Sequence, residues 1–236
     1  MKTVILCGGK GTRISEETVK IPKPMVKIGK IPILEHIMNY YSHFGNNYFI
    51  LALGYKQQNI IEYFNKDKFK KKWEIEFVDT GLETLTGTRL KRLKKYFIEN
   101  ENFHFTYGDG LSNVNLKKLK DFHKKSKKIC SVTAVRPTSR FGELILKKNK
   151  VLKFEEKPQV SKNWINGGFF VLNYKVFDYL VKKNHMFERE AITKLCQKNQ
   201  ISAFKHYDKW HCMDTMRDKL ILNNFLTKRK AFWILK

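Results

Sequence analysis

The sequence predicts an α/β fold, a Rossmann-like three-layer domain built on a mostly parallel sheet. Over the first 135 residues, short apolar runs alternate with segments of helical periodicity, which is the pattern of parallel strands connected by helices. A glycine-rich loop directly follows the first apolar run. In the second half, strand-like runs are separated only by short turns. This last pattern predicts an inserted antiparallel part, because antiparallel strands need only short connections.

The first part of the chain contains the parallel layer. Pro32 suits the first position of a helix, and apolar residues then recur on one helical face up to Phe44. Alternating or continuous apolar runs mark the strands. We expect strands at 4–7, 48–53, 74–78, 103–107 and 129–135, and helices at 31–44, 57–64 and 116–125.

The second part contains the insertion and the end of the fold. We expect strands at 144–146, 151–155, 164–172, 201–204 and 210–213, and helices at 176–180, 188–196 and 214–228. The first three of these strands form the predicted antiparallel insertion. We expect one domain over 1–236, with a nucleotide-binding part at about 1–135, an acceptor-binding part at about 136–213 and a C-terminal helix at 214–228.

Composition limits the possible classes of function. The 236 residues suffice for one sizeable domain. No apolar run reaches the ~18 residues of a membrane span, and the first residues do not form a secretory signal, so we expect a cytoplasmic protein without a membrane partner. The net charge of +25 comes from diffuse lysine rather than a basic patch interleaved with aromatic residues. It therefore predicts attraction of anionic substrates, not a dedicated nucleic-acid site.

The glycine loop Gly8-Gly9-Lys10-Gly11-Thr12-Arg13 is the most informative segment. Glycines after a strand let backbone N–H groups approach a phosphate closely. The loop matches neither the P-loop nor the dinucleotide fingerprint. Arg13, with Lys23 of Pro22-Lys23-Pro24, adds cations that suit a pyrophosphate leaving group.

Two aspartates follow predicted strands. Asp109 stands between Gly108 and Gly110, and Asp214 follows the strand that ends at Met213. A lone aspartate at such a place is most often a helix cap or a turn residue. A pair that converges at strand ends is, in contrast, a standard arrangement for Mg²⁺ with phosphate oxygens.

Two further motifs point to an acceptor site. Glu156 and Lys157 precede Pro158, which favours a rigid, extended exit from the preceding strand. Lys157 suits an acceptor phosphate, and Glu156 suits acceptor hydroxyls. Asn166-Gly167-Gly168 interrupts an apolar strand, which indicates either close approach of a ligand or backbone, or a β-bulge.

These motifs together resemble the nucleotide-diphospho-sugar pyrophosphorylases, which are sugar-phosphate nucleotidyltransferases. The resemblance runs over nearly the whole chain. Within the family, the chain is most similar to the glucose-1-phosphate cytidylyltransferase branch. Particular matches to this branch are Ser15-Glu16-Glu17-Thr18, Tyr41-Ser42-His43, Val78-Asp79-Thr80-Gly81, Thr86-Gly87-x-Arg89-Leu90-Lys91-Arg92, Trp164-Ile165-Asn166-Gly167-Gly168-Phe169-Phe170, Glu188-Arg189-Glu190 and Met213-Asp214-Thr215. The Thr86–Arg92 segment is close to diagnostic of the branch.

The resemblance implies an Mg²⁺-dependent enzyme that transfers CMP from CTP to a phosphorylated small molecule, as a homo-oligomer, in capsule or surface-polysaccharide biosynthesis. It implies Asp109 and Asp214 as metal ligands, and Arg13, Lys23, Asp109 and Lys157 as catalytic residues. The implied nucleotide-binding residues are Gly8, Gly9, Gly11, Thr12, Arg13, Lys23, Gly81, Arg89 and Asp109. The implied acceptor-binding residues are Gly142, Glu143, Glu156, Lys157, Asn166 and Gly167.

The chain departs from the glucose-specific pattern at three carboxylates. Glu143 follows Arg140-Phe141-Gly142 where a small residue is usual, Glu35 stands at a common tryptophan position, and Glu83 replaces a commonly neutral residue. A carboxylate near the acceptor suits an acceptor that carries an ammonium. Two acceptors therefore remain open, glucose 1-phosphate and an amino-acid phosphate such as L-glutamine phosphate. A non-catalytic nucleotide-sugar sensor on the same fold is the alternative function.

Overall fold

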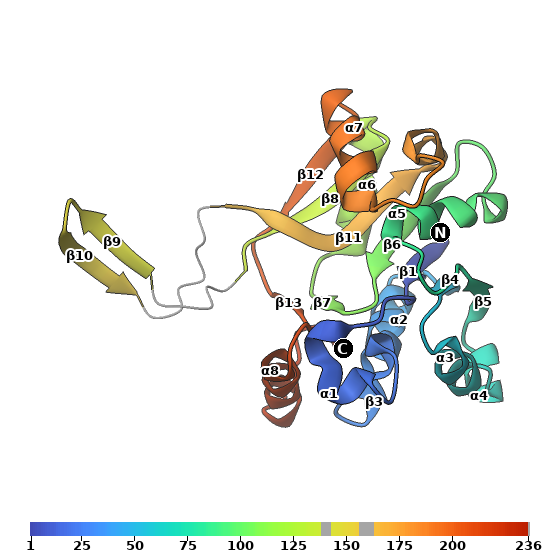
Figure 1. Cartoon of the computed structure of the whole chain (residues 1–236), viewed down its shortest axis with the longest axis horizontal. Coiled ribbons are helices and arrows are strands. Elements are labelled where there is room, and N and C mark those ends of the chain that lie inside the picture. Colours follow the sequence, from blue (N-terminus) through green and yellow to red (C-terminus); the bar gives the residue numbers. More distant parts are fainter. Residues whose placement is uncertain (138–142, 156–162, 236) are drawn as a thin grey trace.

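The computed structural model describes residues 1–137, 143–155 and 163–235. Its centre is a seven-stranded sheet in the order β12-β8-β11-β6-β1-β4-β5 (Figure 1). Only β11 is antiparallel to its neighbours β6 and β8; the other neighbouring pairs in this sheet are parallel. The strands are β1 (Thr3–Leu6), β4 (Tyr48–Leu53), β5 (Glu74–Asp79), β6 (Asn102–Tyr107), β8 (Cys130–Val135), β11 (Ile165–Asn173) and β12 (Ile201–His206).

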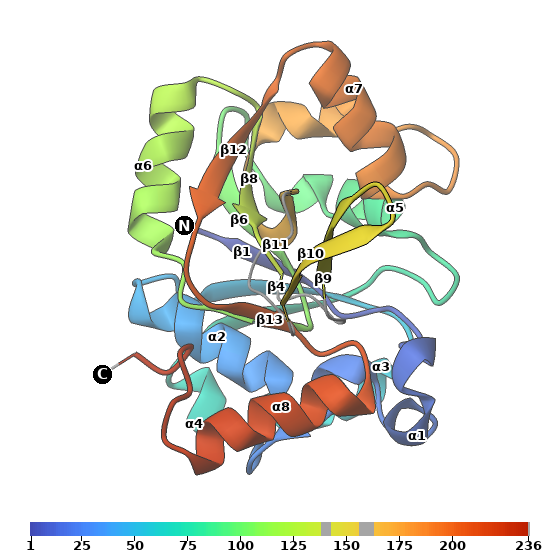
Figure 2. The same cartoon turned by 90° about the vertical axis from the view of Figure 1, so that its left-hand side faces the viewer.

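Helices cover both faces of the sheet, because successive strand residues point to opposite faces. In β1, Ile5 packs into a core shared with α2, α3 and α8, while Val4 and Leu6 pack into a second core shared with α5 and α7. Figure 2 shows α2 and α8 on one side and α7 on the other. The helices are α1 (Ser15–Thr18), α2 (Ile33–His43), α3 (Gln57–Phe64), α4 (Asp67–Lys70), α5 (Thr86–Arg92), α6 (Leu116–Ser126), α7 (Ile192–Gln197) and α8 (Met216–Thr227).

Three short antiparallel pairs complete the fold. β2 (Lys27–Ile28) pairs with β3 (Ile31–Pro32), and β7 (Gly110–Ser112) pairs with β13 (Trp210–Cys212). The hairpin of β9 (Glu143–Lys147) and β10 (Lys150–Glu155) stands away from the body (Figure 1). The β7–β13 pair matters for function, because it joins the segments that follow two core strands.

The predicted three-layer fold is confirmed, and most predicted elements lie within a few residues of the observed ones. One predicted grouping was wrong. The strand expected at 164–172 is β11, which lies in the central sheet between β6 and β8 rather than with the hairpin. Its Phe169–Leu172 run is buried, and such a strand satisfies its backbone best inside the sheet. Helix α5 was not predicted as a helix, although its sequence was singled out as a motif.

The predicted helix at 188–196 consists of two pieces. A π-helical turn at Phe187–Ala191 leads into α7, and such turns often mark functional sites. Similarly, the helix expected at 176–180 is a 3₁₀ segment at Tyr174–Tyr179. In the described part of the chain, no helix is both long and apolar enough to cross a membrane.

Candidate active site

A cleft of about 520 Å³ lies at the carboxyl ends of β1 and β6. This edge is where ligands bind in open α/β sheets. The glycine loop after β1, the loop before α5, the start of β11 and the β7–β13 pair contribute to its walls. The residues of the predicted site that line it are Gly8, Gly9, Gly11, Arg13, Lys23, Arg89, Asp109, Asn166, Gly167 and Asp214.

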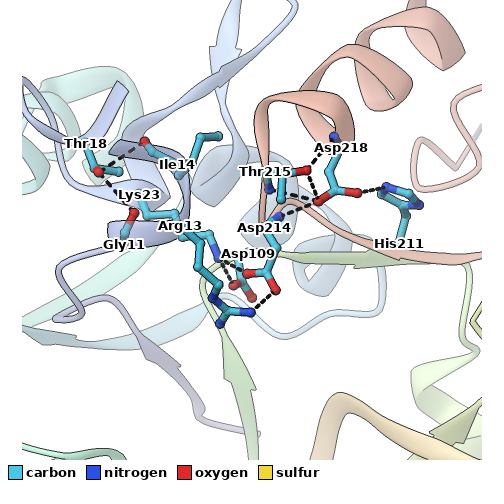
Figure 3. A network of polar contacts seen from close by, with 10 residues as sticks. All are labelled: Gly11, Arg13, Ile14, Thr18, Lys23, Asp109, His211, Asp214, Thr215 and Asp218. Carbon is cyan, nitrogen blue, oxygen red and sulfur yellow. Dashed lines mark hydrogen bonds and ion pairs between the residues drawn. The ribbon is translucent and has the colours of Figure 1, made fainter. Parts of the chain in front are cut away.

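Lys23 lies at the centre of the charged end of the cleft. Its Nζ is 2.5 Å from Oδ2 of Asp109 and 2.6 Å from Oδ1 of Asp214, and Arg13 pairs with the other oxygen of Asp214 (Figure 3). Burial alone would lower the pKa of Lys23, but the two carboxylates raise it above its ordinary value. The lysine is therefore a fixed cation between two anions at neutral pH.

The β7–β13 pair explains why two distant aspartates meet. Gly110 faces Cys212 in its register, and the N–H of Met213 donates to the carbonyl of Asp109 at 2.9 Å. The two carboxylates therefore leave neighbouring strand ends. The sequence left it open whether two aspartates at strand ends of one sheet converge. Both carboxylates contact Lys23, but the strands that bring them together form a separate small pair rather than part of the central sheet.

Asp214 is fixed by the start of α8. Thr215 caps this helix in a capping box with Asp218. Asp218 also accepts from the N–H of Asp214 at 3.1 Å and contacts Nε2 of His211 at 3.1 Å (Figure 3). Burial would raise the pKa of Asp218, but the hydrogen bonds from Thr215 and the nearby His211 hold it below its ordinary value. Asp218 thus stays an acceptor that orients Asp214.

The donor set at this end fits Mg²⁺. Two carboxylates converge on one point, now held by the Lys23 ammonium, and Mg²⁺ is commonly held by one or two carboxylates together with substrate phosphates. Within the described residues, no group of three or more His, Cys, Asp or Glu side chains is arranged to hold a metal by itself. The geometry therefore suits a metal that arrives with a phosphorylated substrate.

Arg89 connects the loops beneath the glycine loop. Its guanidinium donates to the carbonyls of Gly8 (2.8 Å), Leu53 (2.8 Å) and Leu82 (3.1 Å) and to the hydroxyl of Thr80 (2.7 Å). Burial lowers its pKa, but an arginine stays charged. The phosphate contact expected for Arg89 stays a prediction. What the geometry shows is a buried cation that holds the ends of β1, β4 and β5 together.

A second group of polar side chains in the lining of the cleft contains Asn166 and Glu188. Glu188 accepts hydrogen bonds from Tyr107 (2.5 Å) and Thr86 (2.6 Å), and Asn166 donates to the Tyr107 hydroxyl at 3.2 Å. Sequence reasoning gave no site role to Tyr107, Thr86 or Glu188. Glu188 and Thr86 lie inside two of the motifs shared with the family, and these motifs could have pointed to a role in the site. For Tyr107 the sequence predicted only the last residue of a strand.

The glycines of β11 lie both in a β-bulge and in a close approach of the backbone to a side chain, the two explanations that the sequence left open. The register with β8 shifts between Asn166 and Phe170, as in a β-bulge. Gly168 has a φ of +79°, and a Cβ there would lie 2.7 Å from the Tyr107 ring. The bulge and the close approach are therefore one feature, because the bulge brings the backbone onto the ring.

Some predicted residues lie elsewhere. Thr12 and Gly81 are not among the lining residues of the cleft. Gly142, Glu156 and Lys157 fall outside the described residues, and Glu143 begins β9 with a side chain that is not described. Of the other unusual carboxylates, Glu83 pairs with Lys10 of the glycine loop at 2.6 Å, and Glu35 accepts from Tyr63 at 2.7 Å.

Known proteins share this architecture. The family model described as "Nucleotidyl transferase" matches residues 2–228. The chain is 43% identical to glucose-1-phosphate cytidylyltransferase of Salmonella typhimurium, over 99% of this chain and 98% of that protein. It is 42% identical to a probable glucose-1-phosphate cytidylyltransferase of Bacillus subtilis, over 99% of each. The crystal structure of HddC from Yersinia pseudotuberculosis, complexed with GMP-PN, is similar with a TM-score of 0.74 and 26% identity, over 95% of this chain and 99% of that one.

Proposed function

The chain belongs to the nucleotidyl transferase family, and we propose that it is a cytidylyltransferase that transfers CMP from CTP to glucose 1-phosphate and releases pyrophosphate. The observation that carries this proposal is the 43% identity to a glucose-1-phosphate cytidylyltransferase over nearly the full length of both chains. The charged residues at the cleft support it, because Arg13, Lys23, Asp109 and Asp214 are present and already meet there.

The reaction needs positioning and charge more than proton transfer. An acceptor phosphate is already anionic at pH 7, so its oxygen attacks the α-phosphorus of CTP in line without a general base. Arg13 and the N–H groups of the glycine loop stabilise the negative charge that develops on the leaving pyrophosphate. Lys23 and Lys157 align the two reacting phosphates, and Asn166, Gly167 and Glu156 hold the acceptor.

Asp109 and Asp214 are the residues that would hold Mg²⁺. The metal, when bound, offsets phosphate charge in the transition state. The Lys23 ammonium contacts both carboxylates and so fixes their relative position.

Glucose 1-phosphate is favoured over an amino-acid phosphate as acceptor by the names of the two relatives. The case for an acceptor with an ammonium depended on Glu143, whose side chain is not described. No observation favours the sensor, since the four charged residues that a sensor could lose are retained at the cleft.

We also propose a homo-oligomer in the cytoplasm, where CTP is available. The support for assembly is the β9–β10 hairpin. Leu144 faces Phe154 and Leu146 faces Val151 across its strands, and each of these four side chains is more than half exposed. An apolar face of this kind is typical of an interaction surface.

The acceptor is tested by pyrophosphate release with Mg²⁺ and CTP, with glucose 1-phosphate and L-glutamine phosphate in parallel. Turnover with glucose 1-phosphate supports the proposal. Turnover with the amino-acid phosphate alone would show that this compound, and not glucose 1-phosphate, is the acceptor. It would also support Glu143 as an acceptor-binding residue. No turnover with either, combined with CTP binding, would favour the sensor.

A further inference from the structure

A chain of hydrogen bonds joins three side chains that line the cleft. It begins at Glu188 in the π-helical turn, continues through the hydroxyl of Tyr107 at 2.5 Å, and ends at the side-chain amide of Asn166, 3.2 Å from that hydroxyl. The second oxygen of Glu188 accepts from Thr86 at 2.6 Å. None of these contacts involves Arg13, Lys23, Asp109 or Asp214.

The direction of each bond in this chain is fixed by chemistry. A carboxylate only accepts hydrogen bonds, so the Tyr107 hydroxyl must donate to Glu188. The 2.5 Å distance between the two oxygens fits this direction. The Tyr107 oxygen can then accept a hydrogen bond but not donate one to Asn166. The NH₂ group of Asn166, rather than its amide oxygen, must therefore face the tyrosine.

The opposite side of the amide is fixed as well. Oδ1 of Asn166 accepts from the N–H of Gly168 at 2.8 Å. One N–H and one lone pair of the amide remain for a ligand, because an amide has two donors and two acceptor positions. Asn166 therefore presents one defined donor–acceptor pair to the cleft.

The backbone around this amide is rigid. The indole N–H of Trp210 donates to the carbonyl of Gly167 at 2.7 Å, and Gly168 packs on the Tyr107 ring. At the other end, the N–H of Phe187 donates to the Thr86 hydroxyl at 2.9 Å, so the hydroxyl that holds Glu188 is itself held. A rigid support of this kind is what a precise binding group requires.

We propose that Glu188 is a positioning residue that orients the Asn166 amide through Tyr107 and so sets the affinity for the hydroxyl groups of a sugar-phosphate acceptor. The inference rests on the proposed function, because it assigns the amide to the acceptor rather than to the nucleotide. Glu188 does not need to touch the substrate for this role.

The test compares Glu188→Ala, Glu188→Gln, Tyr107→Phe and the double variant Glu188→Ala/Tyr107→Phe. Loss of one buried hydrogen bond is worth about tenfold in binding. Glu188→Ala and Tyr107→Phe are therefore each expected to raise the KM for glucose 1-phosphate about tenfold, with the KM for CTP within about twofold. Glu188→Gln keeps an oxygen that accepts from Tyr107, so it should stay within about threefold of the wild type.

The double variant distinguishes a relay from two separate contacts. If both residues act through Asn166, its KM for glucose 1-phosphate rises about tenfold, as in the single variants, rather than the about 100-fold of independent sites. Additive effects, an equal rise in the KM for CTP, or an unchanged Tyr107→Phe enzyme would each overturn the proposal. If Glu188→Ala does not fold, Tyr107→Phe and Glu188→Gln still carry the test.

Glu190→Ala is the matched control. Glu190 lies in the same turn, but its carboxylate accepts from the backbone N–H of Met186. Its removal is expected to affect stability and not the KM for glucose 1-phosphate. Calorimetric binding of glucose 1-phosphate without CTP gives a second readout. A wild type that releases no pyrophosphate would refute the proposed function, whereas an active wild type with unaffected variants would refute only this inference.

Discussion

The single residue on which the charged end of the cleft depends is Lys23. Its ammonium contacts both Asp109 and Asp214, so its loss removes the cation between the two carboxylates and leaves Arg13, which pairs with Asp214, as the remaining counter-ion. Repulsion between like charges then displaces the aspartates that the reaction needs. In the proposed function this lysine both fixes the two aspartates and aligns the phosphates.

We therefore expect Lys23→Ala and Asp109→Asn each to lower kcat at least ~100-fold, the scale of one lost preorganised charge contact. Lys2→Ala serves as the control, because Lys2 pairs with Glu101 at 3.2 Å near the opposite ends of the strands. Steady-state pyrophosphate release measures the effect. Near-normal turnover of either variant would remove that residue from the mechanism.

Alanine substitutions at two glycines, Gly54 and Gly9 of the glycine loop, can separate effects on stability from effects on CTP binding. At Gly54 a Cβ would lie 2.6 Å from the Arg89 guanidinium and 2.9 Å from the carbonyls of Gly8 and Gly81, whereas at Gly9 it would meet nothing within 4 Å. We expect Gly54→Ala to lower the free energy of unfolding by about 1–3 kcal/mol through overpacking.

Gly9→Ala, in contrast, should change the free energy of unfolding by less than ~0.5 kcal/mol and raise the KM for CTP, because the free space over Gly9 faces the cleft. Urea unfolding and CTP titration of both variants measure this. Equal destabilisation by the two substitutions would show that Arg89 does not fill the space that Gly54 leaves.

At the scale of elements, the β9–β10 hairpin has two chemically different faces. Leu144, Leu146, Val151 and Phe154 share one face, and Ile145 lies on the other, opposite Lys153. If the apolar face packs on another copy of the chain, a charge there must be desolvated without a partner.

The double variant Leu144→Lys/Phe154→Lys is accordingly expected to shift the protein to a smaller species in light scattering coupled to size exclusion. Ile145→Lys adds one positive charge to the other face and should leave the mass unchanged. A wild type that is already monomeric, or a double variant with unchanged mass, would contradict assembly through this face.

Periodicity predicted most elements because their apolar residues are local signals. The helical stripe of 33–43 and the alternation of 74–78 both correspond to observed elements. Helix α5 could not be found in this way, since its sequence TGTRLKR has few apolar residues and its buried Arg89 is satisfied by distant carbonyls. The place of β11 depends on which strands pair, and pairing is a property of the tertiary fold.

For the whole molecule, buried histidines predict a pH dependence of stability. Burial lowers the pKa of His104 to about 3 and that of His123 to about 4, whereas the unfolded value is about 6.5. Below pH 6.5 the unfolded chain therefore binds protons that the folded chain does not. Stability is fully present above that pH and falls as the pH is lowered.

Each of these two histidines should lower the free energy of unfolding by about 2 kcal/mol between pH 7 and pH 5. Urea unfolding at the two pH values measures this loss of stability. In His123→Gln the loss between pH 7 and pH 5 should be smaller by about 2 kcal/mol, the contribution of one histidine. A loss that His123→Gln leaves unchanged would mean that His123 is protonated in the folded state.

The site was predictable where a residue follows a strand and carries charge. Asp109 and Asp214 follow strand ends, Arg13 ends the glycine loop and Lys23 follows it, so all four could be named as candidates from the sequence. Glu188 lay inside a sequence motif, but its contact with Tyr107 could not be predicted, because the contact joins residues 81 positions apart and depends on the π-helical turn. Arg89 was recognised from its motif, but its contacts with four loop oxygens appear only in the folded structure.

The most direct test of the proposed function is the choice of nucleotide. Pyrophosphate release is measured with Mg²⁺ and glucose 1-phosphate, with CTP, UTP, GTP and dTTP supplied separately, for the wild type and for Lys23→Ala. The proposed function predicts rapid release with CTP, much slower release with the other three, and loss of the CTP reaction in Lys23→Ala. Preference for another nucleotide, or full activity of Lys23→Ala, would contradict it.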